Sequence, residues 1–181
     1  MSSGSMVARL AAGCAALAYG VLGVVVPWKG TGGGEYVHDF EYVIGYALVV
    51  AVLGVAVAVG LFRERSRWGP LLVRVGAVVL AVGVMWGNVT GDDPSWFAVF
   101  GAPGNLLLLA GCVLIAKALW RDGGWVRAFA VMLAVSVPVS LVAAEVGGAF
   151  LAAVVWALVA CGLVPAHGAS APSAEPAPVS A

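Results

Sequence analysis

The sequence predicts an all-α fold, a bundle of six transmembrane helices, and three observations support this prediction. First, the 181 residues are 62% hydrophobic and only 10% charged, with a mean hydropathy of +1.05, whereas soluble domains have about 25% charged residues. Second, the chain contains six apolar stretches close to the ~20 residues that cross about 30 Å of hydrocarbon. Third, eight of the nine Lys and Arg residues fall on one side of these stretches.

The spans follow one another through short connections. We place them at Ala8–Val26, Tyr42–Phe62, Pro70–Gly87, Trp96–Ala118, Val126–Ala144 and Ala149–Leu163. The sixth is short, so a full crossing would require the bilayer to thin locally. A secretory signal peptide is the alternative interpretation of the first span. We expect an uncleaved span instead, because its apolar run of about 17 residues exceeds the usual ~7–15 and no small-residue cleavage site follows it.

These spans define the domain organisation. Residues 1–7 form a short N-terminus and residues 8–164 the transmembrane domain. Residues 165–181 are an Ala/Pro/Ser-rich tail. A segment of this composition cannot bury enough apolar surface to offset the entropy lost on ordering, so we expect the tail to be disordered.

The positions of the basic residues predict the orientation. Lys and Arg favour the cytoplasmic ends of spans; Arg9 precedes the first span, and Lys29 alone lies on the other side. We therefore expect both termini in the cytoplasm, and the residue composition is typical of a GC-rich bacterial genome and hence of a bacterial-type plasma membrane. Seven further residues are expected to anchor this topology at the cytoplasmic ends of spans two to five: Arg63, Arg65, Arg67, Arg74, Lys117, Arg121 and Arg127.

Polar residues on the predicted outer side form a candidate ligand-binding site. Pro103, between Gly101 and Gly104, is expected to make the fourth span depart from a regular helix near Asn105. The backbone opened there would give an outer vestibule access to water, and its carboxylates would attract a cation or a small polar solute. The alternative is that loops at a membrane surface are simply polar. The residues proposed to converge are Asn105, Glu41, Asn88, Asp92, Asp93 and Glu145.

Motifs for catalysis, metals and cofactors are missing from the sequence. It contains no H-E-x-x-H, G-x-S-x-G or P-loop pattern, and its three Cys include no C-x-x-C pair. We therefore predict no catalytic residues, no metal, no cofactor and no enzyme activity. A net charge of +0 argues against a nucleic-acid partner. The expected partners are the lipid bilayer and other membrane proteins.

Two hypotheses about function remain. The first is an accessory, scaffold or assembly protein of the cytoplasmic membrane, which fits the short loops and the absence of motifs. The second is a transporter or channel-like protein for a small solute or cation that enters from the acidic outer vestibule. A polar cavity that reaches Asn105 from outside would favour the second hypothesis, and a packed apolar bundle would favour the first.

Overall fold

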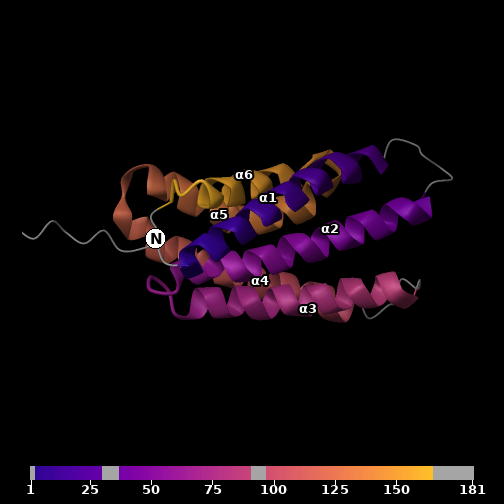
Figure 1. Cartoon of the computed structure of the whole chain (residues 1–181), viewed down its shortest axis with the longest axis horizontal. Coiled ribbons are helices and arrows are strands. Elements are labelled where there is room, and N and C mark those ends of the chain that lie inside the picture. Colours follow the sequence, from indigo (N-terminus) through magenta and orange to yellow (C-terminus); the bar gives the residue numbers. More distant parts are fainter. Residues whose placement is uncertain (1–2, 30–36, 91–96, 165–181) are drawn as a thin grey trace, which may run out of the picture.

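The apolar stretches form helices in the computed structural model, which describes residues 3–29, 37–90 and 97–164. Six α-helices in these ranges lie side by side in one all-α bundle (Figure 1). They are α1 Ser3–Lys29, α2 Val37–Ala58, α3 Trp68–Thr90, α4 Phe97–Leu119, α5 Gly124–Val142 and α6 Ala149–Ala160. Three short 3-10 turns extend or join them: η1 Val59–Phe62, η2 Trp120–Asp122 and η3 Ala144–Val146.

Five of the helices described, α1 to α5, are long and apolar enough to cross a membrane. The sixth, α6, has 12 residues and therefore extends about 18 Å at 1.5 Å per residue. It is shorter than the predicted Ala149–Leu163 because a left-handed residue, Gly162 with φ +71°, ends it. The all-α architecture of a multi-pass membrane protein is thus confirmed, with one helix too short to span the hydrocarbon by itself.

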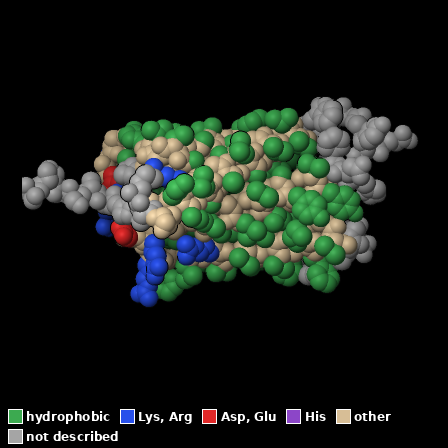
Figure 2. All heavy atoms as spheres, viewed as in Figure 1, with side chains coloured by type: hydrophobic (Ala, Val, Ile, Leu, Met, Phe, Trp, Pro, Cys, Tyr) green, Lys and Arg blue, Asp and Glu red, His purple; other side chains and the backbone are tan. Residues whose placement is uncertain are grey.

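The helices alternate in direction, so the bundle has two distinct ends. The start of α1, the α2–α3 connection and the α4–α5 connection lie together at one end, which we call the basic end (Figure 1). Lys and Arg side chains gather there in the space-filling view, and hydrophobic side chains are spread along the rest of the face that it shows (Figure 2). Exposed hydrophobic residues occur on several helices, for example Leu17, Val82 and Val142, which are 75%, 50% and 90% exposed. Lipid tails solvate side chains of this kind.

Three tryptophans at the basic end point outward, as expected for indole rings at the headgroup level. Trp68, Trp120 and Trp125 are about half exposed. Trp156, in α6, is instead 3% exposed and belongs to the core. The predicted tail from residue 165 lies outside the described residues.

Helices α3 and α4 pack closely because glycines face backbone across their contact. A Cβ built on Gly76 would lie 2.7 Å from the carbonyl oxygen of Gly104, and one on Gly111 would lie 2.7 Å from that of Gly69. The glycines recur every seven residues, at 69, 76 and 83 on α3 and at 104 and 111 on α4. A repeat of seven residues is typical of helices that wrap around each other in a left-handed supercoil.

This packing corrects the expected interruption of the fourth span. Helix α4 runs unbroken from Phe97 to Leu119 with Pro103 inside it. Pro103 lies in the second turn, where it removes the bond to the carbonyl of Val99 and its ring crowds that carbonyl, yet the helix continues on both sides. Gly104 does not open the helix: a Cβ there would lie 2.6 Å from Cγ of Leu80, so its missing side chain serves contact with α3.

The basic end is held by contacts between connections. The Arg65 guanidinium forms an ion pair with Asp122 and so joins the α2–α3 connection to η2. Nε of Arg74 donates a hydrogen bond of 3.0 Å to the carbonyl of Ala56, in the last turn of α2. We expected Arg74 to act as a topology anchor; it also bonds the backbone of a neighbouring helix.

Arg9 makes a further contact at this end. A Cβ on Gly162 would lie 2.5 Å from Nη1 of Arg9, so the guanidinium rests against the turn that ends α6. Positive charge at a helix C-terminus is favourable because it faces the negative end of the helix dipole. The contact places the turn after α6 beside the first turns of α1, at the basic end.

Candidate functional site

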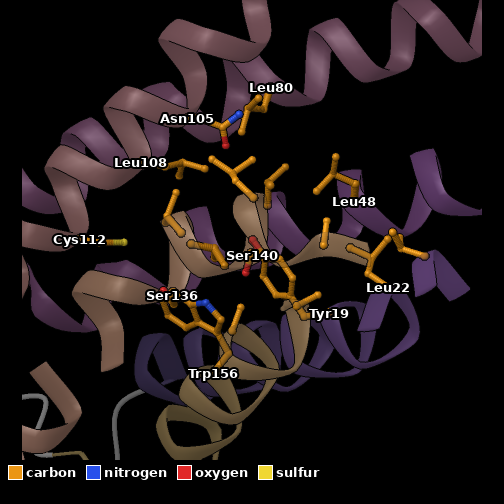
Figure 3. Close-up of a pocket in the computed structure, with 18 of the residues that line it drawn as sticks. Tyr19, Leu22, Leu48, Leu80, Asn105, Leu108, Cys112, Ser136, Ser140 and Trp156 are labelled. Atoms are coloured by element: carbon orange, nitrogen blue, oxygen red, sulfur yellow. The ribbon is translucent and has the colours of Figure 1, made fainter. Parts of the chain in front are cut away.

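A cavity of about 200 Å³ lies at the centre of the bundle and receives side chains from all six helices. It extends from Cys112 and Trp156 in the middle of the bundle to Val26, Ile44 and Ala144 near the end opposite the basic residues. Most of its wall is aliphatic. The side chains that bring polar atoms to it are Tyr19, Asn105, Cys112, Ser136, Ser140 and Trp156 (Figure 3).

Asn105 enters the cavity from α4. Its Nδ2 donates a 2.8 Å hydrogen bond to the carbonyl of Gly101, one turn earlier in the same helix. This bond orients the amide, and its oxygen points into the cavity (Figure 3). An amide oxygen accepts two hydrogen bonds, so Asn105 offers a fixed acceptor to a molecule in the cavity.

Two serines from α5 face the cavity one turn apart. Oγ of Ser136 donates to the carbonyl of Leu133 at 2.8 Å, and Oγ of Ser140 donates to the carbonyl of Gly148 at 3.5 Å. The second bond is long, so the Ser140 hydroxyl is only weakly held by the protein. Pro138 lies between them in a helix that stays α-helical to Val142.

Aromatic side chains of α1 and α6 form the opposite part of the wall. Tyr19 and Trp156 both line the cavity, and they lie across it from Asn105 (Figure 3). A phenol donates or accepts a hydrogen bond, and an indole N–H donates one. The two rings also provide flat apolar faces against which another ring can pack.

The remaining walls decide which ligands the cavity can hold. Leu22, Leu48, Val52, Leu80 and Leu108 are among the aliphatic side chains that enclose it. No Asp, Glu, Lys or Arg is among the lining residues in the described part of the chain. A bare cation would lose its hydration there without a compensating charge, which is costly. An uncharged, mainly apolar molecule with one or two polar groups matches the wall.

Of the six candidate site residues, Asn105 lines this cavity. The structure places Asn88 elsewhere, between α3 and α2, where a Cβ on Gly45 would lie 2.4 Å from its Nδ2. That nitrogen is buried without a hydrogen-bond partner among the described residues. Glu41 lies in α2 and Glu145 in η3, but the structure does not describe the side chain of either residue. Asp92 and Asp93 lie outside the described residues altogether, so convergence on a vestibule stays a prediction.

Other features of the sequence could have indicated the cavity residues, although the search for polar and acidic residues on the outer side did not include them. Ser136 and Ser140 are four residues apart, which places them on one face of a helix. Tyr19 and Trp156 are aromatic residues with a polar atom, each away from the ends of its helix. In the described residues no group of three His, Cys, Asp or Glu side chains is arranged to hold a metal ion.

Comparison of the chain with models of known protein families, with curated proteins and with solved structures gives no match.

Proposed function

We propose that this chain is a multi-pass protein of a bacterial-type cytoplasmic membrane that binds a small, uncharged and largely apolar molecule in its central cavity. The observation that carries the proposal is Asn105, whose amide is oriented by the Gly101 carbonyl and presents its oxygen to a cavity with a mainly aliphatic and aromatic wall. A single oriented acceptor in an apolar site is how proteins fix the orientation of such ligands.

The volume supports a ligand of modest size. An apolar cavity of ~150 Å³ holds benzene, and this cavity has about 200 Å³. A substituted six-membered ring with one hydroxyl or amino group fits this space. Its ring would pack against Tyr19 and Trp156, and its polar group would bond to Asn105 or Ser140.

This proposal refines the transporter hypothesis and leaves the accessory hypothesis as its alternative. The apolar wall favours an uncharged solute over the cation that the acidic outer loops suggested. A transporter must bind its solute before it can move it, so the experiment measures binding alone.

Thermal unfolding of the purified protein with a pair of probes tests the proposal. Phenol and toluene have nearly the same shape, and only phenol donates a hydrogen bond. We expect both to raise the unfolding temperature. In Asn105→Leu the affinity for phenol should fall about 5-fold, the usual effect of one lost hydrogen bond, whereas toluene should bind at least as well as before.

The control variant is Ala102→Leu, which adds the same side chain to an exposed position of α4 and should leave both affinities unchanged. If neither probe stabilises the wild-type protein, the cavity is not a ligand site and the accessory hypothesis is preferred. Stabilisation by potassium or tetramethylammonium, without any effect of phenol, would instead support the acidic vestibule.

A further inference from the structure

A second hollow lies on the outer surface of the bundle, between α4 and α5 near the basic end, and its volume is about 510 Å³. We call it the α4–α5 groove. Lys117, Trp120 and Arg121 line its outer part. Its apolar walls are Val113, Ala116, Ala130, Val131, Ala134 and Val135.

We propose that the α4–α5 groove binds an anionic phospholipid, with an acyl chain along its apolar walls and the phosphate between Lys117 and Arg121. The site is separate from the central cavity, and the proposal does not depend on what that cavity binds.

The shape of the groove follows from its small side chains. Helix α4 packs through Gly104 and Gly111 on the side that faces α3, and it presents Ala116 on the side that faces α5. Ala130 and Ala134 oppose it, so the two helices leave a furrow that no bulky side chain fills. From Val113 to Arg121 the furrow extends about 12 Å along the helix axis at 1.5 Å per residue, a length suited to the upper part of an acyl chain.

The charge at the outer part of the groove is positive. Lys117 and Arg121 are four residues apart and therefore on one face, and both are exposed. Among the described residues no carboxylate pairs with either. The neighbouring carboxylate, Asp122, forms its ion pair with Arg65 of the α2–α3 connection. Two cations beside an apolar furrow match a phosphate joined to acyl chains.

The position of Trp120 indicates that Lys117 and Arg121 lie at the depth of the lipid headgroups. Its ring is 50% exposed, and the Arg127 guanidinium lies over it at 5.7 Å from the ring centre. Nε of Arg127 also donates to the carbonyl of Trp120 at 3.2 Å, so the ring and its surroundings are held in place. Since indole rings favour the headgroup level, the adjacent Lys117 and Arg121 lie where lipid phosphates are.

An anionic lipid is a better occupant than a second copy of this chain. An apolar helix seated in the groove would cover the ammonium of Lys117 without supplying a negative charge, at a desolvation cost. A zwitterionic lipid supplies the phosphate but adds a cation beside Arg121. A lipid with net negative charge places its phosphate between the two side chains and adds no further cation.

Native mass spectrometry of the full chain in mild detergent tests the proposal, with dioleoylphosphatidylglycerol and dioleoylphosphatidylcholine as probes. The wild-type protein should retain the phosphatidylglycerol in preference. The double variant Lys117→Gln, Arg121→Gln should bind it roughly 10-fold less tightly or worse. The matched control Arg63→Gln, Arg67→Gln removes the same charge from the same end of the bundle and should bind it as the wild type does.

A third variant, Ala134→Leu, fills the apolar part of the groove and keeps both charges, so it too should weaken phosphatidylglycerol binding. Inorganic phosphate at millimolar concentration should not displace the lipid. Equal losses in the two double variants, equal retention of the two lipids, or displacement by inorganic phosphate would each overturn the proposal. So would a lipid-independent dimer that Ala134→Leu abolishes, because the groove would then hold a second copy.

Discussion

Arg65 shows how a residue predicted to orient the chain also stabilises the folded bundle. It belongs to the basic cluster that the sequence assigns to topology, and its side chain is only 7% exposed. Its partner Asp122 lies 57 residues later in the chain. The charge pattern could predict that both residues lie at one end of the bundle. It could not predict that they pair, because pairing depends on how two connections fold over each other.

We expect Arg65→Gln to lower the stability of the purified protein by roughly 1–3 kcal/mol, measured by thermal or denaturant unfolding. Removing one partner leaves the other charge uncompensated in a largely buried setting, and the partial exposure of Asp122 reduces the cost.

The control for this prediction is Arg63→Gln, which removes the same charge from an exposed position of the same connection and should change stability little. The double variant Arg65→Gln, Asp122→Asn should regain part of the loss, because it leaves neither charge alone. Equal stabilities of the two single variants would contradict the structural role of the ion pair.

At the scale of helices, the packing of α3 against α4 depends on glycines that cannot accept a side chain. A Cβ at Gly76 would lie 2.7 Å from the Gly104 oxygen and 2.8 Å from the Leu108 nitrogen. Both are backbone atoms, so relief requires the helices to separate. At Gly83 the nearest atom, 2.8 Å away, is Cβ of Phe100, which moves only with its backbone, so this position is closed to a side chain as well.

A set of three substitutions tests this interpretation. Gly76→Ala should lower stability by about 1–3 kcal/mol or more, the usual cost of overpacking, and Gly83→Ala should lower it by a similar amount. Gly20→Ala is the control, since a Cβ there meets no heavy atom within 4 Å. Unfolding temperatures in one detergent measure all three variants. If Gly76→Ala matches Gly20→Ala, the two helices are not held by backbone contact.

The same helices show where sequence reasoning reaches its limit. The composition and the apolar runs predicted six helices in the right order, because hydrocarbon requires every backbone group of a span to bond internally. They did not predict the heptad glycines as a contact face or the continuity of α4 through Pro103. Glycine beside proline favours an interruption in isolation, and only the partner helix shows that Gly104 is there for close approach.

For the whole molecule, the central cavity was the part least visible in the sequence. Lipid and protein interior are both apolar, so a span does not reveal which of its faces points inward. Val131 and Leu133 are aliphatic residues of the same span, yet the first is 46% exposed and the second 1%. Asn105 stood out because an amide within a span is costly without a partner. Tyr19 and Ser140 became site residues only once six helices were assembled.

The arrangement of the whole bundle leads to a prediction about its orientation in the membrane. Seven expected anchors and Arg9 lie at the basic end, which Lys and Arg bias toward the cytoplasm. The contact of Arg9 with the turn after α6 returns the chain to that end even though α6 is short. Reporter fusions after Ser66, Asp122 and Ala181 should therefore read as cytoplasmic, and fusions after Gly34 and Asp92 as external. A cytoplasmic reading at Gly34 would reverse the orientation, and an external reading at Ala181 would mean that α6 does not return the chain across the bilayer.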